Sequence, residues 1–193
     1  MIARVVASSL VAVLVVLVGA SALIYAGIYD VAAAEPHWSV TTWLLETART
    51  RSIEAHSAGI QVPPGLDDPA KVLSGVDHYA AHCAVCQGAP GVPKGDIVRG
   101  LYPTPPDLAE AAPFYSAGLF WIVKHSIKMT GMPAWSGHSD DVLWTTIACL
   151  EKLPGMSEQE YATLVTASLA HGGHHDHAAG DHNSIHPDPT KSP

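Results

Sequence analysis

Residues 78–91 read HYAAHCAVCQGAPG and place two cysteines, Cys83 and Cys86, two residues apart. A pair with this spacing can be a redox dithiol, a disulfide, part of a metal site or the attachment point of a c-type haem. Haem attachment uses the pattern C-x-x-C-H, whose histidine binds the iron, and in this chain Gln87 stands at that position. From these residues alone the four interpretations stay open.

The composition excludes several classes of protein. The chain has 193 residues and a formal net charge of −8, with only ten Lys and Arg, so we expect no nucleic-acid-binding surface. Hydrophobic residues make up 48% of the chain and charged residues 15%, which is not the composition of a disordered protein. Three cysteines are too few for a disulfide scaffold. The length fits one compact domain with appendages.

The N-terminal region, residues 1–34, is predicted to be a membrane anchor. The stretch from Val5 to Ile28 carries no charge, and as a helix it would be about 36 Å long, enough to cross a hydrocarbon core of about 30 Å. A cleaved signal peptide is the alternative, because the alanines at 32–34 suit a cleavage site. In both cases the rest of the chain is exported, which places the cysteines in an oxidising compartment.

Residues 35–68 are predicted to form a juxtamembrane helix and a linker. A helix over 39–56 would carry an apolar stripe with a period near 3.6, formed by Val40, Trp43, Leu44 and Ala48. This stripe could rest on the membrane or on the domain behind it. The proline-rich stretch that follows reads as a linker or turn.

A compact domain is predicted over residues 69–169, and its patterns are helical throughout. Apolar periodicity and capping residues predict helices over 69–84, 114–128, 139–153 and from Ser157 onward. The segment 88–113 is rich in proline and glycine and is predicted to be a long loop, which in a small domain is usually functional. No strand pattern occurs, so the expected fold class is all-α, with an N-terminal transmembrane helix and long loops.

The last segment, residues 170–193, is rich in histidine and poor in apolar residues. We expect it to be disordered because it has no apolar face to bury. Neutral imidazoles at these spacings can bind copper, nickel or zinc loosely.

Three stretches together resemble the membrane-anchored monohaem class I cytochromes c: the segment 78–91, GLYPTPPDL at 100–108 and FWIVKHSIKMTGMPAW at 120–135. The resemblance implies a small all-α haem domain over 69–169. It implies that Cys83 and Cys86 form thioethers to haem c, that Met132 is the distal iron ligand, and that Pro106 is the proline whose carbonyl receives the proximal imidazole. Gln87 stands where that imidazole should be and does not match.

The resemblance also implies an activity. The protein would be an electron carrier rather than an enzyme, held in a bacterial cytoplasmic membrane with its C-terminal domain in the periplasm. Its redox partner would be a membrane protein such as a dehydrogenase or a terminal oxidase. His/Met ligation raises the reduction potential of haem, and without the histidine the potential cannot be assigned.

Gln87 leaves three outcomes. The haem attaches and finds another ligand; the haem is absent and Cys83 pairs with Cys86; or Gln87 is an altered residue in an ordinary cytochrome. The Gln87 amide could also donate a hydrogen bond to the Pro106 carbonyl, as the imidazole would. The alternative functions are a non-haem copper or metal-handling protein using Cys83, Cys86, His82, Met132 and the tail, or a cofactorless structural subunit.

Several residues near these motifs have simpler interpretations. Met129 is the rival of Met132 as a ligand. His78 and His82 are expected to be exposed helix residues, and His125 is not expected to be a ligand. Cys149, on an apolar helix, is expected to be a buried, inert thiol. The tryptophans at 121, 135 and 144 are expected to be mainly core residues, any one of which could line a haem pocket.

Overall fold

The computed structural model describes residues 1–112 and 114–170, and the regular structure within them is helical, without a strand. The prediction of an all-α fold is confirmed for this part of the chain. Its one extended pairing is an isolated bridge between Ala89 and Val92. The predicted tail lies outside the described residues, except for Ala170, which ends the last helix.

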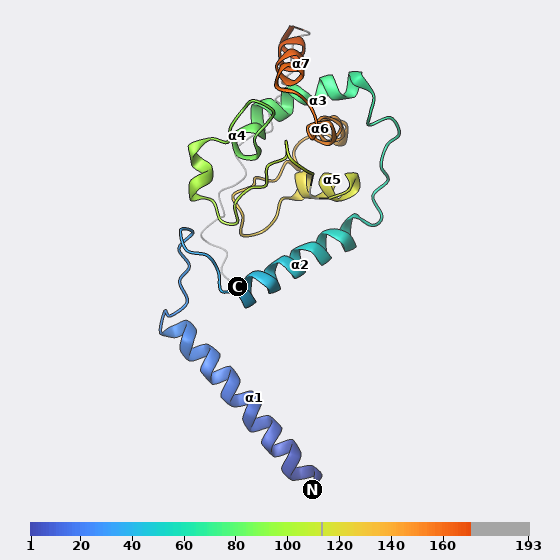
Figure 1. Ribbon diagram of the computed structural model, residues 1–193. Coiled ribbons are helices and arrows are strands. Elements are labelled where there is room, and N and C mark those ends of the chain that lie inside the picture. The colour runs from blue at the N-terminus through green and yellow to red at the C-terminus, as the bar shows by residue number, and fades with distance from the viewer. Residues whose placement is uncertain (113, 171–193) are drawn as a thin grey trace, which may run out of the picture. The chain divides into compact units, whose positions relative to one another are not determined.

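The chain divides into two compact units, Met1–Thr42 and Trp43–Pro193 (Figure 1). The first unit contains helix α1, Ile2–Tyr25. Among the described residues this is the one helix long and apolar enough to cross a membrane. It therefore meets the requirement of length and composition for the predicted span.

Helix α2, Ser39–Ser57, begins in the first unit and continues into the second. Its inward face consists of Leu45, Arg49, Ile53 and Ser57, which follow one another at helical spacing and are half-buried or buried. The predicted apolar stripe lies on the opposite face and is exposed to solvent. The second unit therefore begins inside the segment that the sequence assigns to a juxtamembrane helix and linker.

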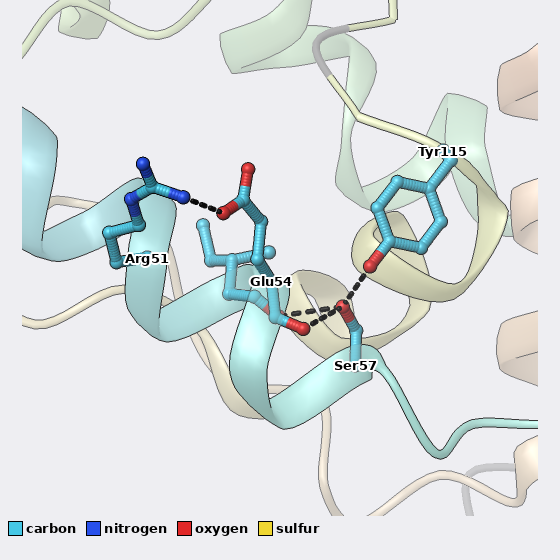
Figure 2. A network of polar contacts seen from close by, with 5 residues as sticks. Arg51, Glu54, Ser57 and Tyr115 are labelled. Carbon is cyan, nitrogen blue, oxygen red and sulfur yellow. Dashed lines mark hydrogen bonds and ion pairs between the residues drawn. The ribbon is translucent and has the colours of Figure 1, made fainter.

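A part-buried contact between two hydroxyl groups holds the end of α2 against the segment that precedes α5. The Ser57 hydroxyl donates to the Ile53 carbonyl at 2.6 Å and lies 2.7 Å from the Tyr115 hydroxyl (Figure 2). Because the Ser57 proton is engaged with Ile53, Tyr115 is the donor in the second contact. One exposed turn away, Arg51 pairs with Glu54 at 3.2 Å.

Beyond α2, the described residues of the second unit form five α-helices and a short 3₁₀ helix. Their bounds are α3 Pro69–His82, α4 Ala84–Gln87, η1 Asp96–Gly100, α5 Ser116–His125, α6 Asp140–Lys152 and α7 Glu158–Ala170. Helix α3 packs against α6, α7 and α4, and α5 packs against α6 (Figure 1). The core between them includes Val76, Tyr79, Leu119, Val123, Leu143, Ile147, Leu150 and Tyr161.

The predicted helix starts coincide with side-chain caps. Asp68 accepts a hydrogen bond from the amide of Ala70, with Pro69 in the first turn of α3. Ser139 caps α6. At α7, Ser157 and Glu160 exchange hydrogen bonds with each other's backbone amides, which confirms the predicted capping box.

The helix ends differ from prediction in two places. The first helix of the domain stops at His82, and a separate single turn, α4, contains the second cysteine. The second stops at His125 rather than residue 128, because Ser126 adopts φ 63°, which no α-helix can contain.

Helices α3 and α6 approach each other closely at Gly75. A β-carbon on this residue would lie 1.8 Å from the Thr145 carbonyl oxygen. Only glycine therefore permits this crossing, which fixes the angle and depth at which α3 delivers its C-terminal end to the site described next.

Candidate functional site

A cleft opens where the end of α3 and the turn α4 face the loops around residues 101–106 and 127–135. The space in it that a water-sized molecule can reach is about 150 Å³, which is below the range of about 300–1,000 Å³ common to small-molecule sites. The structure brings all the predicted site residues to this cleft: its walls include Cys83, Cys86, Gln87, Pro106 and Met132.

The first wall is the junction between α3 and α4. The amides of Cys86 and Gln87 both donate to the Cys83 carbonyl, at 3.0 and 2.9 Å, and this tight turn brings the two thiols to one side. Both cysteines are half-buried free thiols. Burial raises the pKa of Cys83 to about 12, so this sulfur stays protonated at neutral pH unless it is covalently modified.

Gln87 presents an unsatisfied acceptor to the cleft. Its Oε1 atom is buried and accepts no hydrogen bond from any described residue. Its backbone carbonyl accepts from the amide of Leu108 at 3.1 Å, which holds the proline loop beside α4. The suggested bond from the Gln87 amide to the Pro106 carbonyl does not form among the described residues. An acceptor buried in this way costs free energy, so a bound group that donates to it or coordinates it would be favoured.

The opposite wall is a loop that presents one of the two rival methionines. The Met132 carbonyl accepts from the Ser126 hydroxyl at 2.6 Å, and its amide is 3.3 Å from the Thr130 hydroxyl. Met132 lines the cleft, whereas Met129 is 74% exposed and does not. The structure therefore selects Met132 as the sulfur donor that a bound group would meet.

Gly131 allows this loop to close on the proline loop. A β-carbon at this position would lie 2.5 Å from Cδ2 of Leu101, itself part of the cleft wall. The glycine before the methionine thus sets the width of the cleft.

Arg49 is a cleft residue that the sequence analysis missed. It extends from the inward face of α2, and its Nε atom is buried without a hydrogen bond to any described residue. The cleft therefore combines apolar walls, two thiols, a thioether, an amide oxygen and one cation. The spacing of Arg49, Ile53 and Ser57, four residues apart, places them on one helical face and could have indicated that Arg49 points inward. The stripe on the other face is more apolar and was therefore the more obvious candidate for burial.

The prediction that His78 and His82 are exposed is wrong. Both are half-buried, with ring centroids 4.7 Å apart. Trp135 lies 5.2 Å from His78 and 4.9 Å from His82, and the ring of His138 lies 5.0 Å from His78. These four rings lie together because the loop that carries Met132 continues past the C-terminal half of α3. It places Trp135 and His138 beside the two histidines of that helix.

The remaining candidates lie as the simpler interpretations predict. Cys149 is fully buried, and burial raises the pKa of its thiol to about 12. His125 is exposed and outside the cleft lining. Trp144 stacks on Phe120 at 4.2 Å, and of the three tryptophans considered only Trp135 lines the cleft.

The copper or metal-handling alternative finds no preformed site in the part of the chain that the structure describes. No three His, Cys, Asp or Glu side chains converge there in a geometry that could hold a metal ion. The histidine-rich tail falls outside the described residues.

We find no match to this chain among protein-family models, curated proteins or solved structures.

Proposed function

We propose that this protein is a membrane-anchored electron carrier of the cytochrome c type, with haem c held in the cleft. One observation carries the proposal: both cysteines of the CxxC turn and Met132 line the same cleft. That combination follows the order of motifs shared with the class I cytochromes c.

The residues present fit such a group in four respects and differ in one. The cysteines supply two sulfurs, the lining includes four prolines with Leu101, Ile127 and Trp135, and Met132 supplies a soft donor. Arg49 supplies a cation suited to an acidic substituent. The difference is Gln87, whose buried amide oxygen replaces an imidazole nitrogen.

When bound, haem would supply a single-electron couple between ferrous and ferric iron. Cys83 and Cys86 would hold it through thioether bonds, and Met132 would ligate it. The Ser126 and Thr130 hydroxyls fix the backbone of Met132. The apolar walls exclude water, which limits the reorganisation that a change of charge demands.

Because Gln87 replaces the histidine, one coordination position of the haem iron would be open or weakly ligated. A neutral amide oxygen donates less electron density to iron than an imidazole does. The expected result is a predominantly high-spin centre, or one ligated by Met132 with a labile partner, that binds carbon monoxide or cyanide readily.

The proposed location is a bacterial cytoplasmic membrane, with α1 as a single span and the second unit in the periplasm. Arg4 precedes the uncharged stretch that begins at Val5, which favours an orientation with the N-terminus inside. A membrane-bound redox partner such as a dehydrogenase or a terminal oxidase would exchange the electron.

The test begins with absorption spectra of the purified full chain, oxidised and reduced, and a haem stain on a denaturing gel. Gln87→His should increase haem content, give a low-spin spectrum and slow the binding of exogenous ligands. In that background Met132→Ala should abolish the methionine-to-iron charge-transfer band, while the control Met129→Ala should leave it in place.

Two outcomes would overturn the proposal. One is an absence of covalent haem in both the native chain and Gln87→His. The other is a haem spectrum and content that Gln87→His leaves unchanged, because the iron would then lie elsewhere.

A further inference from the structure

The first half of α2 exposes an apolar surface. Val40 and Trp43 are each 65% exposed and Leu44 is 58% exposed, while Ala48 continues the same face. We call these four residues the outer stripe. Arg51 follows at the same angular position, and its exposed guanidinium marks where the apolar surface ends.

The outer stripe cannot turn inward without unpacking the helix. Ile53 is 1% exposed, and Ser57 is fixed by Tyr115. Both lie on the opposite side of α2, since residues nine apart in a helix, such as Leu44 and Ile53, are about half a turn out of phase. The inward face of α2 already packs against the second unit, so the outer stripe must be shielded from water by something else.

The start of α2 is tied to the end of α1 within the first unit. The Tyr29 hydroxyl is 2.8 Å from Nδ1 of His37, and the Tyr29 ring meets the Trp38 ring edge-on at 5.0 Å. Tyr29 follows the last residue of α1, Tyr25, by four positions, a reach of at most about 14 Å. Trp38 immediately precedes α2 and is therefore held near the end of the span.

We propose that the headgroup region of the membrane covers the outer stripe, so that the first turns of α2 lie in the lipid interface. This inference rests on the membrane anchor of the proposed function and is independent of haem. Tryptophan is enriched at this depth because its ring is apolar and its N–H finds polar partners. Interfacial helices present Trp, Phe or Leu on the face that enters the lipid, and the outer stripe presents Trp43 and Leu44.

A second copy of the chain is a poorer cover for this surface. Stable protein interfaces use about 20–30 residues on each side, whereas the outer stripe has four.

The experiment uses the full chain reconstituted in vesicles that contain phosphatidylcholine brominated at shallow or deep acyl positions. Tryptophan emission is measured for the native chain, for Trp43→Phe and for the control Trp121→Phe, whose ring contacts His56 and His125 in the second unit. Trp43→Phe should remove a large part of the quenchable emission, more with shallow than with deep bromine. Trp121→Phe should leave the quenchable emission unchanged.

The outcomes separate this inference from the anchor itself. A chain that floats with carbonate-washed vesicles but whose quenching is insensitive to Trp43→Phe would overturn the interfacial placement and leave the anchor intact. A chain that does not float would overturn both. Insensitive quenching, together with a cross-linked dimer that Trp43→Glu abolishes, would replace lipid by a second copy.

Discussion

The buried hydroxyl of Tyr79 donates a 2.6 Å hydrogen bond to the carbonyl oxygen of Gly88. The bond joins the last turn of α3 to the residue that follows α4, across the turn that carries both cysteines. Gly88 has φ 74°, and a β-carbon there would lie 3.2 Å from Oδ1 of Asp107. Tyr79 thus fixes the exit from the cysteine turn at a point where the backbone can reverse only with glycine.

Tyr79→Phe should destabilise the protein by about 1–3 kcal/mol, because the Gly88 carbonyl would be left buried without a donor. Urea denaturation followed by circular dichroism measures this. The comparison variant is Tyr115→Phe: the Ser57 hydroxyl keeps its bond to Ile53, so the loss should be nearer to about 0.5–1.5 kcal/mol. Equal losses of stability in the two variants would show that the hydrogen bond from Tyr79 to Gly88 contributes no more to the free energy of unfolding than the contact between Tyr115 and Ser57.

Gly75→Ala should destabilise the protein despite the better helix propensity of alanine. Propensity alone favours alanine by about 1 kcal/mol, but the new methyl group would meet the Thr145 carbonyl, and overpacking typically costs about 1–3 kcal/mol or more. Gly137→Ala is the matched control, since no atom lies within 4 Å of its β-carbon position. A melting temperature for Gly75→Ala at or above that of the native chain would contradict the close crossing of α3 and α6.

The two faces of α2 should respond differently to truncation. Ile53→Ala should cost about 2–5 kcal/mol because it opens a cavity in the core. Leu44→Ala, on the outer stripe, should change stability in detergent by less than about 0.5 kcal/mol. Thermal unfolding of both variants in the same detergent checks this, and the reverse order would mean that α2 packs through its other face.

Stability should fall as the pH rises above 9. Burial raises the pKa of Cys149 from 9.0 to about 12 and that of Tyr161 from 10.0 to about 12, and it raises the pKa of Tyr79 as well. Between these values the folded chain retains protons that the unfolded chain releases. The free energy of unfolding therefore falls by up to about 1.4 kcal/mol per pH unit for each such proton, while below pH 9 the contribution is complete.

Cys149→Ala should flatten this alkaline loss, because one of the titrating groups is removed. Chemical denaturation between pH 7 and pH 11 provides the profile, with the value at pH 7 serving to subtract the cost of the smaller side chain. A slope identical to that of the native chain would show that the Cys149 thiol does not titrate differently in the two states.

Local sequence determined the elements of this protein. The starts of α3, α6 and α7 follow from Asp68 with Pro69, from Ser139 and from Ser157 with Glu160, because a cap acts within three residues of itself. The apolar run of α1 and the absence of strand patterns depend equally on neighbours in the chain. The CxxC turn, the proline loop and the methionine loop could likewise be named as site segments before their arrangement was known.

Tertiary structure decided which side chains of those segments meet. Met132, and not Met129, shares a cleft with Leu101, which lies about thirty positions earlier in the chain. The inward face of α2 carries Ser57, which meets Tyr115, 58 positions away. Contacts between distant segments also place Arg49 in the lining of the cleft and leave His78 and His82 half-buried. Helical periodicity identifies a face, but only contacts between distant segments determine what covers it.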